Sequence, residues 1–380
     1  MKIYDVIILG AGASSLMCAS HLKKSLDVAI IDINNKVAQK LKISGGGKCN
    51  ITNVAVSEKN FDGDEEFIKS VLKRFSKDDL LDFLDRHNVE LTLRKKRYFF
   101  CKNSSDDIIN VLKKLTSKHK FILDAEILEV SKDDDIFHIK TTKATFKSKK
   151  LIVATGAKSF APLGASDIGL KIAKSFDIKY KEFHPALVGL TVQKEQFWMK
   201  SLSGLSCYVK IKVDGKTLEE DMLFAHKGIS GPAILSASLY WKKGKISIDF
   251  LPNKNIFNLT KNTKKLVSSA IPLPKRLSVE ILKALGVKDV ACNKLDKESK
   301  EKLSLIHNYE FAPAGNFGFT KAEVCRGGVD TNELQTNSLE SKKIKGLYFI
   351  GEVVDVTGEL GGYNFQWAFS SGFVCAKNLQ

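Results

Sequence analysis

The N-terminal segment of this 380-residue chain joins a short β-branched run, a glycine turn and a helix-forming run. Residues 4–9 predict a strand, Gly10-Ala-Gly-Ala-Ser-Ser15 predicts a tight turn, and residues 16–24 predict a helix. A second predicted strand carries Asp32, which lies 22 residues after Gly10. At that spacing a carboxylate accepts hydrogen bonds from ribose hydroxyls. The pattern favours a Rossmann-type start, whereas a glycine turn after a strand is common in any α/β protein.

The glycines of this turn have separate roles. Gly10 supplies the turn, and Gly12 lets the backbone approach a pyrophosphate at the helix N-terminus, where free N–H groups attract anions. Ser15 stands where a third glycine is usual, and it is small enough to keep the helix close to the strand. We expect a dinucleotide to contact five residues here: Gly10, Gly12, Ala13, Ser14 and Asp32.

Length and composition indicate a soluble protein of mixed α/β class with two or three domains. No run approaches the roughly 18–20 apolar residues of a membrane helix, and the N-terminal apolar stretch fits a Rossmann strand better than a signal peptide. Seven scattered cysteines without a Cys-x-x-Cys pair indicate neither a disulfide framework nor a metal site. We therefore expect a cytoplasmic protein without a metal or a membrane partner, and we favour a monomer.

The chain is strongly basic, with 60 lysines and arginines against 43 acids and a net charge of +17. This charge suits a polyanion such as RNA, but only six of the basic residues are arginine, so the lysines can also reflect a lysine-rich proteome. Residues 94–100 set four cations beside three aromatics, a mixture that holds phosphates and stacks bases. The same stretch fits a β-hairpin with a solvated basic turn, and both interpretations stay open. The RNA-binding candidates are Arg94, Lys95, Lys96, Arg97 and Tyr98.

The pattern along the chain predicts an α/β multi-domain fold. The nucleotide-binding part includes a helical excursion over 61–120, and strand-forming runs with an Asp214-Gly215 turn predict an antiparallel β domain. A lysine-rich, helical insertion follows. The three parts are expected at 1–187 with 323–380, at 188–253 with 311–322, and at 254–310.

Further glycine motifs narrow the kind of nucleotide-binding protein. Ser44-Gly-Gly-Gly-Lys-Cys-Asn-Ile-Thr-Asn53 is a second glycine-rich loop close to the first, and Ala154-Thr-Gly156 follows an apolar strand. Near the C-terminus, a strand delivers Gly351 and Glu352 before Asp355 and Gly361-Gly-Tyr-Asn364. A glycine turn that opens a helix can place N–H donors beside a flavin ring.

With Phe224-Ala-His-Lys-Gly-Ile-Ser-Gly-Pro-Ala-Ile-Leu235, Gly327-Gly-Val329 and Ser338-Leu-Glu-Ser-Lys342, these motifs resemble the BaiN/YhiN-like family of FAD-dependent oxidoreductases, also labelled aminoacetone-oxidase-like. The resemblance covers nearly the whole chain. It implies a two-dinucleotide-fold FAD core made of N- and C-terminal segments, an inserted β-barrel-like domain, a small helical domain, and reduction by NADH or NADPH.

The sequence departs from the family pattern at a few positions. Lys48 stands where arginine is usual, Ser338-Leu339 replaces Thr-Met, and Cys101 and Cys325 replace other residues. The resemblance implies that FAD also contacts Lys40, Ser44, Gly45, Gly46, Gly47, Lys48, Cys49, Asn50, Ile127, Ala154, Thr155, Gly156, Gly351, Glu352, Asp355, Gly361, Gly362 and Asn364.

The family's activities are reductions of activated C=C bonds, including a bile-acid intermediate and uridine of 23S ribosomal RNA. The shared chemistry is hydride transfer from flavin N5 to the β-carbon of a conjugated double bond, with an acid protonating the α-carbon. The candidate acids are, in order, His226 at the start of a predicted helix, Cys49 and Tyr363; a structural hydrogen bond for His226 and a packing role for Cys49 are the alternatives. A small-molecule reductase or oxidase, and a flavin-bound RNA-binding or sensor protein without turnover, remain alternative functions.

Overall fold

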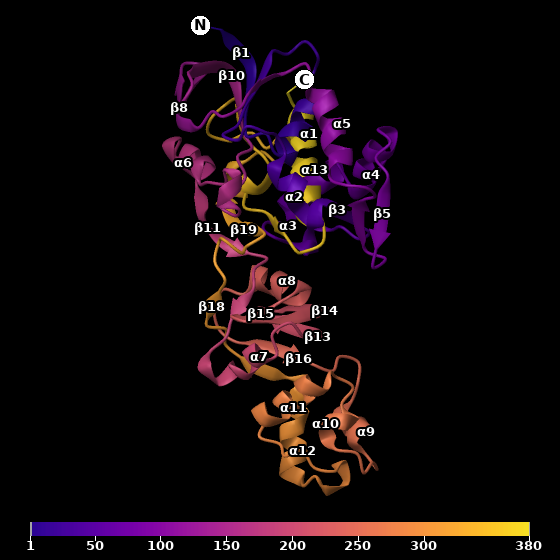
Figure 1. Ribbon diagram of the computed structural model, residues 1–380. Coiled ribbons are helices and arrows are strands. Elements are labelled where there is room, and N and C mark those ends of the chain that lie inside the picture. The colour runs from indigo at the N-terminus through magenta and orange to yellow at the C-terminus, as the bar shows by residue number, and fades with distance from the viewer. Residues whose placement is uncertain (1, 380) are drawn as a thin grey trace. The chain divides into compact units, whose positions relative to one another are not determined.

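The computed structural model describes residues 2–379 and divides into two compact units. Unit 1 comprises Met1–His184 and Val324–Gln380, and unit 2 comprises Pro185–Glu323 (Figure 1). Unit 1 is therefore assembled from both ends of the chain. The finer three-domain division expected from the sequence stays a prediction.

A seven-stranded mixed sheet forms the centre of unit 1. Strands β2, β1, β10 and β20 pair in parallel, as do β2 and β7, whereas β9 and β8 extend the sheet with antiparallel pairing. The strands are β7 (Lys120–Ile122), β2 (Val28–Ile31), β1 (Ile3–Leu9), β10 (Thr145–Val153), β9 (Ile136–Thr141), β8 (Ile127–Asp133) and β20 (Leu347–Phe349). Residues 6–9 and 28–31 are buried without alternation, as in a parallel sheet covered on both faces. The predicted Rossmann-type α/β fold is confirmed.

Two helices from opposite ends of the chain pack against each other in unit 1. Helix α1 (Ala13–His21) begins directly after the glycine turn, three residues earlier than predicted, because Gly12 is already its N-cap. Helix α13 (Tyr363–Lys377) lies beside it (Figure 1). A Cβ on Gly372 would come within 2.4 Å of the Ser14 carbonyl oxygen, so this packing requires glycine.

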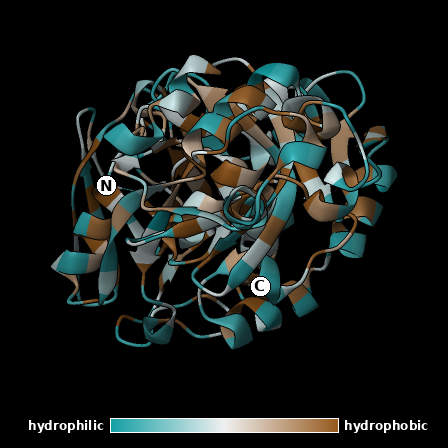
Figure 2. Cartoon of the chain, turned by 90° about the horizontal axis from the view of Figure 1, so that it is seen from below, coloured by the Kyte–Doolittle hydropathy of each residue, from teal (hydrophilic) through white to brown (hydrophobic). Residues whose placement is uncertain are grey.

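The segment 61–120 contains three amphipathic helices: α3 (Glu65–Arg74), α4 (Lys77–Arg86) and α5 (Asp106–Thr116). The side chains of Asp64 and Ser76 cap α3 and α4 by accepting hydrogen bonds from backbone N–H groups in the first turn of each helix. Figure 2 shows hydrophilic and hydrophobic residues mixed along the helices of the chain, as amphipathic helices require. Between α4 and α5, strands β5 (Leu91–Arg94) and β6 (Tyr98–Cys101) form a hairpin that pairs with β3 (Asn50–Asn53).

Smaller elements complete unit 1. Helix α2 (Gln39–Gly47) precedes β3, and α6 (Ile168–Ser175) follows β10 in the chain. Two short sheets pair β21 with β4 and β11 with β19. Their bounds are β21 (Thr357–Gly358), β4 (Phe61–Asp62), β11 (Tyr180–Ala186) and β19 (Val324–Val329).

Unit 2 contains the predicted antiparallel β structure. Seven strands follow the order β17-β16-β13-β14-β15-β12-β18, and α8 (Pro232–Tyr240) packs on β13 and β14. The strands are β17 (Tyr309–Phe311), β16 (Ile246–Asp249), β13 (Ser206–Val213), β14 (Lys216–Ala225), β15 (Gly228–Ser230), β12 (Leu190–Thr191) and β18 (Gly315–Asn316). The predicted antiparallel β domain is confirmed, and the pairing order of its described strands ends at β17 and β18.

The remainder of unit 2 is helical. It contains α7 (Trp198–Ser201), α9 (Ile256–Thr260), α10 (Val267–Ala270), α11 (Lys275–Ala284) and α12 (Lys297–Ser304). A membrane-crossing helix needs a long apolar run, and none of the helices described over residues 2–379 has one.

Candidate active site

The N-terminus of α1 leaves room for an anion. Gly12 is the N-cap with φ −87°, no side chain caps the helix, and its first turn holds no acid. A Cβ built on Gly12 would meet nothing within 4 Å. The N–H groups of Ala13 and Ser14 have no intrahelical acceptor because they lie in the first turn. This open space with uncapped donors fits the pyrophosphate of a dinucleotide.

Asp32 directly follows β2 and lies beside this turn. Its Oδ2 accepts from the Ala11 N–H at 2.6 Å, and its Oδ1 accepts from the backbone and side chain of Asn34 at 2.7 and 2.9 Å. These bonds hold the carboxylate at the end of the strand, where its remaining lone pairs can accept from ribose hydroxyls. Ile127 opens β8 two residues after Ala125, whose N–H donates to the Asp32 carbonyl at 3.0 Å.

Close contacts between glycines and residues distant in the sequence join the other predicted motifs to this turn. Gly10, at φ +100°, would place a Cβ 2.4 Å from the Ala154 oxygen, and Gly351 would place one 2.5 Å from Ser14 Oγ. Thr155 Oγ1 is buried and has no hydrogen-bond partner among the described residues. The three segments meet as the resemblance predicts, and they leave a polar atom available to a ligand.

Lys40 and Glu352 form an ion pair at 2.8 Å, and Lys40 Nζ also donates to Ser159 Oγ at 2.8 Å. The Glu352 carboxylate accepts a further bond from the Cys325 N–H at 3.1 Å. Ser159 was missed from the sequence, although it lies three residues after Gly156. Following that motif to its next hydroxyl side chain would have found it.

The second glycine loop leaves the helical conformation at Ser44. Gly45, Gly46 and Gly47 have φ of +56°, +67° and +82°, a left-handed path that glycine adopts without strain. A Cβ on Gly46 or Gly47 would meet nothing within 4 Å. The Asn50 Oδ1 atom is buried without a hydrogen-bond partner among residues 2–379. An open glycine surface and an unused acceptor both fit a bound flavin nucleotide.

The side chain of Cys49, in the same loop, is directed into the protein core. It is fully buried in a hydrophobic cluster with Leu16, Ile51 and Phe369, and burial raises the pKa of its thiol far above the ordinary value. A thiol in such surroundings holds its proton and packs as a small apolar group. The Lys48 ammonium group already has a partner, since its Nζ donates to the Lys102 carbonyl at 3.3 Å.

The C-terminal turn opens α13 with uncapped donors. Gly362 is the N-cap at φ +91°, and a Cβ there would come within 2.7 Å of the Thr52 backbone. Asn53 Nδ2 donates to the Gly361 carbonyl at 3.1 Å, which ties this turn to the glycine loop. Asn364 is used structurally, because its side chain bonds the Gly358 N–H and carbonyl at 2.9 and 2.8 Å.

Tyr363, the first residue of α13, is only 2% exposed. Burial raises the pKa of its hydroxyl, as does the charge of Glu359, and a hydrogen bond with the Arg97 side chain opposes the rise. The phenol is therefore held protonated and oriented by a cation. Asp355 forms an ion pair with Lys181 at 2.7 Å, so the predicted cofactor contact already has a partner.

The basic stretch is a hairpin, as one of the two sequence interpretations proposed. Lys95 and Lys96 form its turn with φ of +48° and +54°, and residues 94–97 are exposed. The Arg94 guanidinium lies 4.4 Å from the centre of the Phe100 ring, and that of Arg97 lies 5.3 Å from the Tyr98 ring. These cation–π pairs present flat, positively charged faces.

His226 does not lie at the start of a helix, so that expectation is wrong. It is exposed in the turn between β14 and β15, because Ala225 pairs with Gly228, and α8 begins only at Pro232. His226 belongs to unit 2, whereas the predicted flavin residues belong to unit 1.

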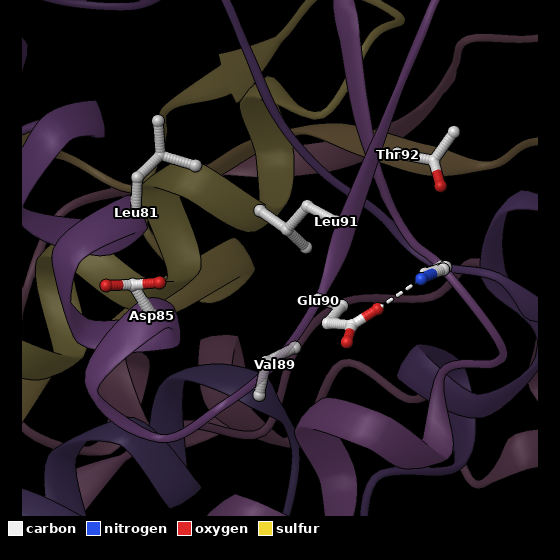
Figure 3. Close-up of a pocket in the computed structure, with 7 residues that line it drawn as sticks. Leu81, Asp85, Val89, Glu90, Leu91 and Thr92 are labelled. Carbon is white, nitrogen blue, oxygen red and sulfur yellow. Dashed lines mark hydrogen bonds and ion pairs between the residues drawn. The ribbon is translucent and has the colours of Figure 1, made fainter.

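A separate hollow of about 470 Å³ lies beside the edge strand β5. Figure 3 shows Leu81 and Asp85 of α4 facing residues 89–92, with the Glu90–Lys102 ion pair at 2.5 Å. No predicted cofactor residue lines it. Within residues 2–379, no group of His, Cys, Asp and Glu side chains is arranged to hold a metal ion.

Comparison with known proteins places the chain in a family. The family model described as HI0933-like protein Rossmann domain matches residues 4–378. The ribosomal RNA dihydrouridine synthases of Escherichia coli and Haemophilus influenzae are 38% and 36% identical, over 100% and 98% of this chain and 98% of each relative. The 3-dehydro-bile acid delta(4,6)-reductase of Clostridium scindens is 28% identical over 97% of both chains.

Solved structures share the fold at low sequence identity. A quinol fumarate reductase chain from E. coli has a TM-score of 0.52 at 13% identity, over 100% of this chain and 70% of that one. A 3-ketosteroid-delta4-(5alpha)-dehydrogenase from Rhodococcus jostii has a TM-score of 0.50 at 12% identity, over 99% and 96%. With the family model matching nearly every residue, the chain belongs to the HI0933-like Rossmann-domain family, the family of FAD-dependent oxidoreductases that its motifs resemble.

Proposed function

We propose that this FAD-dependent oxidoreductase uses NADH or NADPH to reduce uridine to dihydrouridine in ribosomal RNA. Two relatives that align over nearly the whole chain are named ribosomal RNA dihydrouridine synthase. The bile-acid reductase relative is named for reduction of C=C bonds in a small molecule. Uracil belongs to the same chemical class, since its C5–C6 double bond is conjugated to the C4 carbonyl.

The observation that carries the proposal is the contact between the basic hairpin and the glycine turns. The Phe100 ring lies 2.9 Å from the Cβ position of Gly45, and the Tyr98 ring lies 2.8 Å from that of Gly361. Arg97 reaches Tyr363 at the start of α13. An RNA strand bound through phosphates and stacked bases on this hairpin would therefore deliver a splayed-out base to the flavin-binding turns.

The residues of unit 1 fit FAD. The uncapped start of α1 at Gly12 would hold the pyrophosphate, Asp32 the ribose, and the open loop at Gly46 and Gly47 the flavin portion, with Asn50 offering its unused oxygen. Bound FAD would supply the hydride for the substrate after reduction by a nicotinamide nucleotide. The uncapped N-terminus of α13 would favour negative charge nearby.

Tyr363 is the proton donor that the structure of unit 1 supports best. Its phenol is protonated at neutral pH and hydrogen-bonded with Arg97, a cation that stabilises the phenolate left after proton transfer. Reduction of uracil adds a hydride at C6 and a proton at C5. His226 stays a candidate donor predicted from the sequence. We assign Cys49 to packing, because its thiol is enclosed.

The test is anaerobic oxidation of NADH or NADPH by the purified holoprotein, with and without ribosomal RNA lacking dihydrouridine. We expect oxidation of the nicotinamide nucleotide that depends on RNA, with a loss of uridine absorbance that corresponds to one uridine for each nucleotide oxidised. Tyr363→Phe should leave flavin reduction unchanged and slow uridine reduction about 10²–10⁴-fold, the usual contribution of a general acid. An unchanged rate of uridine loss in this variant would remove Tyr363 from the mechanism.

The bile-acid reductase relative supports a second candidate, reduction of a small enone. In the same assay a conjugated enone would then support oxidation of the nicotinamide nucleotide, and RNA would not. RNA binding without any oxidation would instead favour a flavin-bound RNA-binding or sensor protein.

A further inference from the structure

We propose that the helical part of unit 2 carries a second RNA-binding surface, separate from the hairpin of unit 1. It is formed by two adjoining loops with four exposed lysines and an exposed aromatic ring, and this inference rests on the proposed RNA substrate. We call it the lysine surface: Lys261, Lys264, Lys265, Lys294 and Phe257.

The positive charge of the chain is concentrated in this part. Residues 254–302 hold twelve lysines and arginines against five acids, a net charge of +7 in 49 residues. The remaining 331 residues carry a net charge of only +10. A general lysine bias of the proteome would spread the excess evenly, so the concentration indicates a local polyanion site.

The side chains of all five acidic residues in this part already form ion pairs or hydrogen bonds. Three form ion pairs on α11 and α12 at 2.7–4.0 Å, one bonds Ser268, and one caps α12. They are Glu280, Glu298, Glu301, Asp289 and Asp296. Among the ion pairs of the described residues, none involves the four lysines of the lysine surface. Their charges are therefore available to a partner.

Backbone pairing brings the two loops together. Leu266 bridges Ala291 in antiparallel register, and the Cys292 N–H donates to the Lys265 carbonyl at 2.9 Å. Lys265, with Lys264 directly before it, therefore lies beside Cys292, the first residue of the short 3-10 helix Cys292–Lys294 that ends with Lys294. Figure 1 shows α9 to α12 grouped together within unit 2.

The aromatic ring adjoins the lysines. Phe257 is 45% exposed and lies in α9, four residues before its C-cap Lys261, a spacing at which residues of a helix are neighbours. Exposed asparagines at 258, 262 and 293 add amide donors and acceptors. Unpaired lysines beside an exposed ring are the combination that binds backbone phosphates and stacks one base of unpaired RNA.

The test measures binding of a transcribed large-subunit ribosomal RNA fragment to the holoprotein over a range of salt concentrations. The triple variant Lys261→Gln, Lys264→Gln and Lys265→Gln should reduce the slope of log Kd against log salt by about 2, because each single-strand phosphate contact contributes roughly 0.7. The matched control, Lys283→Gln, Lys297→Gln and Lys302→Gln, removes the same charge from paired lysines and should keep the slope.

Phe257→Ala provides a second readout, with affinity about fivefold lower or more and an unchanged salt slope. Equal slopes in the triple variant and its control would overturn the lysine surface, even when the wild-type protein binds RNA and forms dihydrouridine. Absence of salt-dependent binding by the wild-type protein would overturn both this inference and the RNA substrate. Binding of the surface to anionic phospholipid vesicles in preference to the RNA fragment would also overturn it.

Discussion

Substitution of Gly12 by alanine separates cofactor binding from folding. Gly12 has a negative φ, and a Cβ there would meet no protein atom within 4 Å. The free energy of unfolding should therefore fall by only about 1 kcal/mol or less, because an N-cap position prefers glycine to alanine slightly. The added methyl group occupies the space assigned to the pyrophosphate and keeps it from the uncapped N–H groups.

Loss of one or two charge-assisted hydrogen bonds in this way costs about 2–3 kcal/mol, which raises the Kd for FAD roughly 30- to 150-fold. The assay is fluorescence titration of the apoprotein with FAD, together with thermal unfolding of the apoprotein.

Gly10→Ala is the matched control. Its Cβ would lie 2.4 Å from the Ala154 oxygen at φ +100°, so it should lower the free energy of unfolding of the apoprotein by about 2–4 kcal/mol. If Gly12→Ala bound FAD as tightly as the wild-type protein, the phosphate site would not be at α1.

Three further changes test other parts of the account. Reversal of charge at all four basic hairpin positions, Arg94, Lys95, Lys96 and Arg97, should weaken RNA binding and leave FAD binding intact; unchanged RNA binding would make the hairpin a solvated turn. Cys49→Ala should retain turnover and lower the unfolding free energy by about 1–2 kcal/mol, measured in urea, because the thiol only packs; loss of turnover with FAD still bound would contradict this. Burial lowers the pKa of His119 in the folded state, so stability is present above about pH 7 and is lost as pH falls through the unfolded value of about 6.5. His119→Gln should flatten the pH dependence of the urea midpoint of unfolding. An unchanged pH dependence would show that other titratable groups cause it.

Local patterns predicted the elements that depend on nearby residues. The strand, glycine turn and helix around Gly10 and Gly12, the amphipathic helices of 61–120 and the basic hairpin were all visible in the sequence. Their hydrophobic periodicity and turn residues act within about ten positions, the range over which such patterns are informative.

Contacts between residues far apart in the chain determine the features that the sequence did not predict. The glycines after His226 suggested the start of a helix, but Gly228 is required because its Cβ position lies 2.2 Å from the Leu190 carbonyl oxygen on a neighbouring strand. Lys40, Ser159 and Glu352 meet across separations of 119 and 312 residues. Cys49 belongs to a recognisable loop, yet its burial depends on helices contributed by both ends of the chain.

Reduction of uridine in ribosomal RNA would be visible by mass spectrometry of ribosomal RNA from a strain that lacks this gene. We predict that one uridine loses the mass of two hydrogens relative to the parent strain and regains it when the wild-type gene is restored. Restoration with Tyr363→Phe should leave that uridine largely unreduced. An identical set of nucleoside masses in the two strains would contradict the RNA substrate and favour a small enone.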